Sequence, residues 1–208
     1  MIIIGYQGIG KSSLAKSDKE YIDLESSCFW VDGKRSDTWY IPYTQMAEHL
    51  SRQGKIVFTS SHEVVRNQLK SSSEKVICCV PSISLRYDWL DRLKNRYDQT
   101  KLEKDYKAYM NAKERYSDNI KEIMTSGFET IVITCVDYNL KDIIEDYISN
   151  DELREELKRK RVDFTNTMGS EMDKTRQNIL LGKILQCEEL LRGSKRYYYE
   201  IIGANKDE

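Results

Sequence analysis

The sequence has few prolines, no paired cysteine motif and no long apolar run. Only 2 of its 208 residues are proline, and no apolar run approaches the roughly 18 residues of a membrane span. The five cysteines show no CxxC spacing, which argues against a disulfide framework or a zinc site. With 33 basic and 34 acidic residues, the net charge of -1 gives no overall attraction to nucleic acid or anionic membranes. No charged-then-apolar leader is visible, so we expect a cytoplasmic protein whose basic sites are local.

A phosphate-binding pattern lies near the start of the chain. Residues 5–12 read GYQGIGKS, which matches GxxxxGKS, and they follow the apolar run 1–4 directly. Glycines let such a loop turn its N–H groups toward phosphate oxygens, while the lysine reaches the β- and γ-phosphates and the serine hydroxyl coordinates Mg²⁺. A sharp strand-to-helix turn is the alternative. The pattern predicts ATP and Mg²⁺ binding, with Gly8, Ile9, Gly10, Lys11, Ser12 and Ser13 as candidate nucleotide-binding residues.

Short apolar runs alternate with amphipathic stretches along the first two thirds of the chain. Strands separated by helical patterns are typical of crossover units in a parallel sheet, so we expect an α/β fold with five strands. The expected strands are Met1 to Ile4, Tyr21 to Leu24, Lys55 to Thr59, Val76 to Val80 and Thr130 to Val136. Helical spacing is found at Tyr43 to Arg52, at Val64 to Leu69 and over a long region from Leu85 to about Met124.

The long helical region and the end of the chain differ in character. Leu85, Trp89, Leu93 and Tyr97 form one apolar stripe, whereas 101–115 is so polar that it reads as a solvated helix or a mobile cover. Beyond residue 150 the chain is highly charged. The pattern that follows predicts another helix, with a capping box at Ser170 and a stop at Gly193. We expect residues 151–208 to form a helical extension that packs on the core or joins a partner chain into an oligomer.

Three segments resemble the small P-loop kinases of the adenylate kinase and shikimate kinase group. They are GYQGIGKSS at 5–13, YIDLES at 21–26 and RLKNR at 92–96, and the resemblance covers about residues 1–148. It implies a P-loop NTPase three-layer sandwich with a five-stranded parallel sheet of order 2-3-1-4-5. It also implies a kinase core over 1–150 with a helical lid region at about 95–125.

The resemblance implies a catalytic role for two arginines after the fourth strand. Arg92 and Arg96 match the RLxxR of the family, whose arginines neutralise phosphoryl charge during transfer. The alternative is a solvated helix face on which Asp88 and Asp91 pair with them.

An acidic pair stands at the end of the second expected strand. Asp23 and Glu25 are two residues apart, so both side chains lie on one face of that strand. Beside the phosphate loop, Asp23 would hold Mg²⁺ through water as a catalytic and metal-binding residue, and Glu25 would bind or deprotonate an acceptor hydroxyl. This pair resembles the DxD of shikimate kinases. Alternatively, the two carboxylates only cap or solvate the strand end.

The third expected strand ends in Thr59, Ser60, Ser61, His62 and Glu63, with Arg66 one turn later. Adenylate kinases have a DGxPR-like segment here, in which the arginine grips the acceptor phosphate. Arg66 matches that arginine, but the aspartate of the segment is missing. His62 can hydrogen-bond an acceptor or belong to a surface loop. The aromatic rings of 29–43 can stack on a base or fill a small core.

We therefore expect an ATP- and Mg²⁺-dependent phosphotransferase, with catalysis by Lys11, Asp23, Arg92 and Arg96. The expected acceptor is a nucleoside or deoxynucleoside monophosphate bound by Glu25, His62 and Arg66. Two alternatives stay open: a kinase that phosphorylates a hydroxyl of a nucleoside, a polynucleotide 5′ end or another small molecule, and a nucleotide-binding regulatory protein without catalysis.

Overall fold

The structure is a computed structural model that describes residues 1–29, 35–170, 179–181 and 183–185. The chain divides into two compact units, Met1–Leu140 and Lys141–Glu208. This division falls earlier in the chain than the boundary expected at residue 150. Within the described ranges, no helix is long and apolar enough to cross a membrane.

The first unit is built on a five-stranded parallel sheet of order β2-β3-β1-β4-β5. The register pairs Ile2 with Val57 of β3 and with Val76 of β4, so β1 lies in the middle. The predicted α/β class, strand number and strand order are confirmed. The strands are β1 (Ile2–Gly5), β2 (Tyr21–Asp23), β3 (Ile56–Thr59), β4 (Val76–Pro81) and β5 (Glu129–Ile133).

Burial explains why the central strand is a continuous apolar run. Ile2, Ile3 and Ile4 are all 0 % exposed, because helices cover both faces of a parallel sheet. The last strand ends sooner than predicted. β5 pairs with β4 only as far as Ile133, where Pro81 ends β4, and Cys135 is already exposed. The residues after Ile133 therefore form a loop at the carboxyl edge of the sheet.

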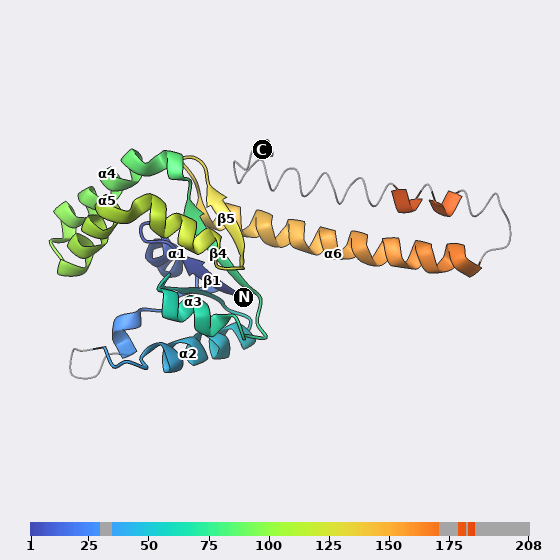
Figure 1. Ribbon diagram of the computed structural model, residues 1–208, viewed down its shortest axis with the longest axis horizontal. Helices are drawn as coiled ribbons and strands as arrows, with labels where there is room; N and C mark the ends of the chain where they lie inside the picture. Colours follow the sequence, from blue (N-terminus) through green and yellow to red (C-terminus); the bar gives the residue numbers. More distant parts are fainter. Residues whose placement is uncertain (30–34, 171–178, 182, 186–208) are drawn as a thin grey trace. The chain divides into compact units, whose positions relative to one another are not determined.

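Three helices lie next to one another along the sheet (Figure 1). α2 (Tyr40–Arg52) packs on α3 (Glu63–Leu69) and on β3, and α5 (Glu103–Met124) contacts β4. An ion pair between Arg66 and Glu122 joins α3 to α5. The first helix, α1 (Lys11–Ser17), begins after the loop that follows β1, is short and contacts β2. Short 3₁₀ turns at Ser26–Phe29 and Ile83–Leu85 follow β2 and β4.

The long helical region predicted after the fourth strand is helical but not continuous. α4 (Arg86–Thr100) ends where Lys101 adopts a left-handed conformation with φ 53°, and α5 then begins at Glu103. Trp89 and Leu93 of the predicted stripe are 0 % exposed. A second interruption lies inside α5, where Arg115 has non-helical angles of φ −129° and ψ 24°. The polar segment from residue 103 to 115 thus forms the first half of a bent helix, and residues 101 and 102 form the connection before it.

The second unit is described over part of its length. α6 (Leu140–Ser170) runs through the charged stretch that follows residue 150. Most of the helix predicted between Ser170 and Gly193, including its capping box and its stop, lies outside the described residues. Within that interval, 179–181 and 183–185 are helical.

Candidate functional site

The loop between β1 and α1 has the backbone conformation that its glycines allow. Gly8 and Gly10 have φ values of 84° and 97°, a region that is unfavourable for residues with a Cβ. Space is also limited: a Cβ on Gly5 would lie 2.6 Å from Cδ of Lys11, and one on Gly8 would lie 3.0 Å from Nε1 of Trp89. A side chain at Gly5 would therefore displace Lys11 and Ile9, and one at Gly8 would adopt an unfavourable φ and press on Trp89 and Leu93.

Three consecutive carbonyl groups of this loop are held by side chains from elsewhere. Trp89 Nε1 donates to Gln7 O at 2.9 Å, and Arg92 Nη1 donates to Gly8 O at 3.4 Å. The hydroxyl of Tyr138 donates to Ile9 O at 2.9 Å. In a trans peptide the carbonyl and the following N–H point in opposite directions. Turning these carbonyls toward α4 and Tyr138 therefore turns the next three N–H groups to the opposite side, as an anion site requires.

Lys11 lies across the loop that it follows. Its Nζ donates to Gly5 O at 2.7 Å and to Tyr6 O at 3.3 Å. Burial lowers the pKa of Lys11, and the charge of Arg96 lowers it further, while Asp23 and Glu25 act in the opposite direction. The lysine, both carboxylates and Arg96 are thus close enough to interact electrostatically, as the sequence predicts for one site.

Ser12 and Asp23 meet beside the loop. The Ser12 hydroxyl donates to Oδ2 of Asp23 in a short hydrogen bond. Among the described residues there is no cluster of three or more His, Cys, Asp or Glu side chains suited to a metal. One hydroxyl and one carboxylate nevertheless fit Mg²⁺, which usually takes few protein ligands and keeps waters and phosphate oxygens.

The two predicted arginines of α4 have different surroundings. Arg92 donates to Val136 O at 2.8 Å and to the hydroxyl of Tyr138 at 2.9 Å, besides Gly8 O. Its guanidinium lies 4.7 Å from the ring centroid of Trp89 and 5.1 Å from that of Tyr138. Arg96 instead forms a 2.9 Å ion pair with Asp105 of α5. Arg92 thus holds the loop, whereas Arg96 contributes charge near Lys11.

A cavity of about 780 Å³ lies beside the loop, between β2, α3 and α5. Glu25, His62 and Arg66, the three predicted acceptor residues, all line it together with Tyr6 and Gln7 of the loop. Lys104 at the start of α5 forms a 3.2 Å ion pair with Glu25. The cavity has five cationic side chains against three anionic ones, namely Arg35, Arg66, Lys104, Lys107 and Arg115 against Glu25, Glu63 and Glu122.

His62 is neutral in this environment. Removal from water, followed by the charges of Arg35, Lys11 and Arg66, lowers the pKa of His62 to about 4. Arg35 Nη1 lies 3.1 Å from Nε2 of His62, and Ser60 Oγ lies 3.0 Å from Nδ1. Because a guanidinium only donates, Nε2 accepts and Nδ1 carries the proton.

The aromatic rings near the cavity pack on one another. Trp39 is 6 % and Tyr43 is 0 % exposed, and their ring centroids are 5.4 Å apart. The Tyr43 hydroxyl donates to Leu24 O at 2.9 Å and accepts from the Ser60 amide at 2.7 Å, which ties the ends of β2 and β3 together. These two rings therefore occupy the core. Trp30, which belongs to the same predicted stacking segment, lies outside the described residues.

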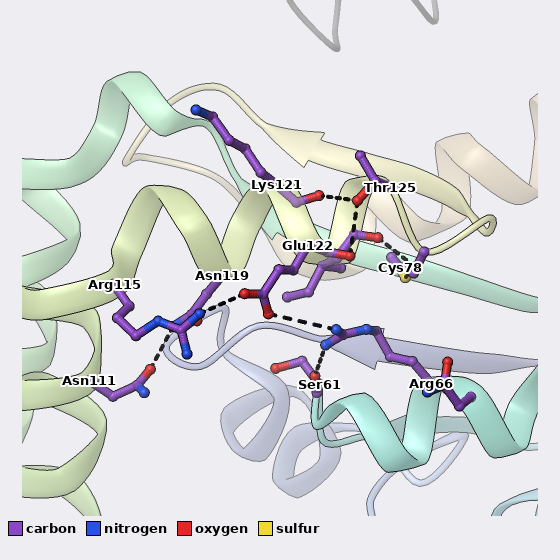
Figure 2. Close-up of polar contacts among 12 residues, drawn as sticks. Ser61, Arg66, Cys78, Asn111, Arg115, Asn119, Lys121, Glu122 and Thr125 are labelled. Carbon is purple, nitrogen blue, oxygen red and sulfur yellow. Dashed lines mark hydrogen bonds and ion pairs between the residues drawn. The ribbon is translucent and has the colours of Figure 1, made fainter.

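Figure 2 shows the polar contacts where α3 meets α5. Arg66 is 7 % exposed, and its guanidinium donates to Ser61 O in a short hydrogen bond. Glu122 lies 3.9 Å from Arg66 and 2.6 Å from Arg115. Arg66 is therefore held rigidly at the cavity wall, although its charge is partly compensated.

Several residues of the site were not found from the sequence. Trp89 was predicted only as a core residue, yet its indole N–H also holds the loop. Tyr138 follows the last strand and carries no motif, and no local signal indicated that it binds Ile9. Asn111 and Asn119 line the cavity from a segment that looked merely polar. The partners of Trp89 and Tyr138 are 82 and 129 positions away, and the two asparagines pair only because the helix bends between them.

Comparison with models of known protein families, with curated proteins and with solved structures finds no match to this chain. The sheet order, the flanking helices and the loop at the carboxyl end of β1 are consistent with a P-loop NTPase-like fold. In open α/β sheets, ligands bind at this edge, where the strand order reverses on either side of β1. The loop and the adjoining cavity are thus the candidate functional site of the protein.

Proposed function

We propose that this protein transfers a phosphoryl group from Mg²⁺-ATP to a nucleoside monophosphate. The observation that carries the proposal is the juxtaposition of two binding sites. An anion-binding loop after β1 opens beside a separate cavity that has its own cationic side chains. A phosphoryl donor and an acceptor can therefore bind next to each other, which is the main requirement of phosphoryl transfer.

The donor end is formed by the loop and the start of α1. The inward N–H groups and Lys11 bind the phosphates, and Ser12 with Asp23 would hold the metal ion, which neutralises developing phosphate charge. Arg96 adds a positive charge close to Lys11. Arg92 acts in this mechanism by keeping Gly8 O turned away from the phosphates.

The acceptor is inferred from the size and charge of the cavity. A volume of about 780 Å³ lies within the range of roughly 300–1,000 Å³ that is usual for small-molecule sites. The excess of two positive charges suits a phosphate monoester, which carries a charge of about −2 at neutral pH. Arg66 adds a positive charge at the buried wall of this cavity, although its guanidinium already contacts Ser61 O and Glu122.

An assay of ADP release with Mg²⁺-ATP and a panel of nucleoside monophosphates tests the proposal. Lys11→Ala should reduce turnover by about 100-fold or more, because one pre-organised contact to a developing charge contributes that much. The matched control is Lys16→Ala, which removes an exposed lysine from the same short helix and should leave turnover unchanged. Undiminished turnover in a folded Lys11→Ala protein would contradict the proposed role of the loop.

A second candidate is a kinase that acts on a hydroxyl group, favoured by the position of Glu25 in the cavity wall and of Asp23 beside Ser12. Either carboxylate could accept the proton of an attacking hydroxyl. The same assay separates the two functions when nucleosides, oligonucleotides with a free 5′ hydroxyl and small alcohols are added to the panel. Turnover with these compounds and none with monophosphates would select the second candidate.

A further inference from the structure

The bend in α5 brings together side chains that a straight helix would keep apart. Asn111 and Asn119 are eight residues apart, a separation of about 12 Å along a straight helix axis. Their amides are nevertheless hydrogen-bonded at 2.7 Å. Arg115 has the non-helical angles between them, and its guanidinium reaches Glu122 at 2.6 Å across the same bend. Neither proline nor glycine causes this bend, so it is held by these side-chain contacts.

The concave side of the bend faces the cavity. Asn111, Arg115 and Asn119 all line it, as do Tyr6 and Gln7 of the loop. Figure 2 shows the hydrogen bond between the two asparagines and the contact of Arg115 with Glu122. Irregular backbone within a helix is costly and is often found at functional sites. Here it places three hydrogen-bonding side chains on one wall of the space that the proposed acceptor occupies.

A buried hydroxyl without a regular hydrogen bond points to a ligand at the same place. Tyr6 is 2 % exposed and lines the cavity, and its hydroxyl lies close to the side chains of Asn119 and Gln7 without a hydrogen bond of regular geometry to the described part of the chain. Burial raises the pKa of Tyr6 to about 12, so the group is a neutral donor and acceptor. An unsatisfied buried hydroxyl is rare in native proteins, because it costs free energy unless something binds it.

The amide pair and the Tyr6 hydroxyl lie side by side. Asn119 uses an N–H of its amide to donate to Oδ1 of Asn111. The amide N–H₂ of Asn111 then remains for another molecule, and the Asn119 amide also approaches the Tyr6 hydroxyl, so the three groups form one polar surface. Nucleobases present adjacent donors and acceptors along their edges, and asparagine amides are among the side chains that pair with them.

The charges at this end of the cavity suit a neutral group. Arg66 and Arg115 both interact with Glu122, so their charges are partly compensated there. Arg35 and Lys107 lie elsewhere on the wall and are not partners of Glu122. A phosphate would therefore be directed away from the bend, toward the loop.

We infer that the α5 bend, formed by Asn111, Arg115 and Asn119 together with Tyr6, is the subsite that recognises the base of the acceptor nucleotide. This inference rests on the proposed function. In this arrangement the phosphate of the acceptor is oriented toward Lys11, while the amide pair and the tyrosine hydroxyl bind the hydrogen-bonding edge of the base. Selectivity among nucleotides is then set by α5 and by the residue that follows β1.

The sharpest test removes only the hydroxyl of Tyr6. Tyr6→Phe should weaken binding of the preferred nucleoside monophosphate by about 3- to 10-fold in calorimetry, while Mg²⁺-ATP affinity and thermal stability are retained. The matched control is Tyr116→Phe, whose ring packs edge-on against Tyr6 at 5.9 Å and whose hydroxyl donates to Ser82 O outside the cavity. That control should lower stability without changing the ranking of nucleotides.

A second variant changes the amide pair without changing its size. Asn119→Asp replaces the donor to Asn111 with an anion, so the preference among the four bases should shift by about 10-fold or more. If both variants bind nucleoside monophosphates with the affinity and the base ranking of the wild type, the proposed subsite is wrong, while the proposed phosphoryl transfer to monophosphates is unaffected. If the wild type binds ATP but no monophosphate, the proposed acceptor and the subsite are both wrong.

Discussion

At the scale of single residues, His62 illustrates how neighbours determine chemistry. Its ring accepts a hydrogen bond from Arg35 and lies edge-on to Trp39, with ring centroids 5.6 Å apart. A second positive charge at this point would repel Arg35 and lie near Lys11 and Arg66, which explains the low pKa. The side chain is therefore a neutral acceptor that orients Arg35 at the cavity wall, rather than a proton donor at neutral pH.

The lowered pKa of His62 predicts a specific pH dependence of stability. Between about pH 6.5 and pH 4 the unfolded chain binds a proton that the folded protein does not bind, so the free energy of unfolding falls as the pH falls through this window. In His62→Gln this contribution is absent, and the loss of stability between pH 7 and pH 4.5 should be smaller than in the wild type. Urea denaturation at several pH values measures the difference, and identical slopes would refute the prediction.

Sequence reasoning succeeded at those residues whose role is local. Gly8, Gly10, Lys11 and Ser12 lie within one turn, so their spacing was sufficient to predict the conformation of the loop, while their binding of nucleotide stays a prediction. The position of Glu25 was expected from the carboxyl end of the second strand, whereas His62 and Arg66 were expected from the resemblance to adenylate kinases, and all three line one cavity. The support of the loop could not be predicted, because Tyr138 and Ile9 are 129 positions apart and neither belongs to a recognisable pattern.

At the scale of elements, α4 has two roles that a helical pattern cannot separate. Trp89 and Leu93 fill the core, and both also pack against Gly8. A Cβ on Gly8 would lie only 3.0 Å from Nε1 of Trp89 and 3.1 Å from Cδ2 of Leu93. The apolar stripe predicted the first role alone. The bend at Arg115 was likewise invisible in the sequence, because it depends on contacts between side chains seven and eight residues apart.

Replacing Trp89, whose indole N–H binds Gln7 O, tests the second role of α4, which is to support the loop. Trp89→Phe keeps a large ring but removes the N–H that binds Gln7 O, leaving that carbonyl free to turn inward. We expect Mg²⁺-ATP affinity to fall by about 3- to 10-fold and stability by about 1–3 kcal/mol. Tyr97→Phe, on the same helix but away from the loop, is the control. Equal ATP affinity of Trp89→Phe and the wild type in calorimetry would show that the brace does not shape the loop.

At the scale of the whole molecule, the proposed binding of nucleotide should stabilise the fold of the first unit. All three tryptophans of the chain lie before residue 140, so their fluorescence reports on the unit Met1–Leu140. At a concentration of Mg²⁺-ATP about 100 times the dissociation constant, the added stability should be about 2.7 kcal/mol. The corresponding rise in melting temperature is about 5–10 °C. Lys11→Ala should show little of this rise, and an unchanged wild-type melting temperature would contradict nucleotide binding.

The bracing of the loop also has a consequence for the order of events in folding. The three hydrogen bonds that turn its carbonyls outward span 82, 84 and 129 positions of the chain. Contacts between such distant positions form slowly, because a long segment must first be closed. The loop at residues 5–12 should therefore acquire its final geometry late, once Trp89, Arg92 and Tyr138 have docked. On the proposed function, a refolding chain would gain affinity for nucleotide only at the end of the process.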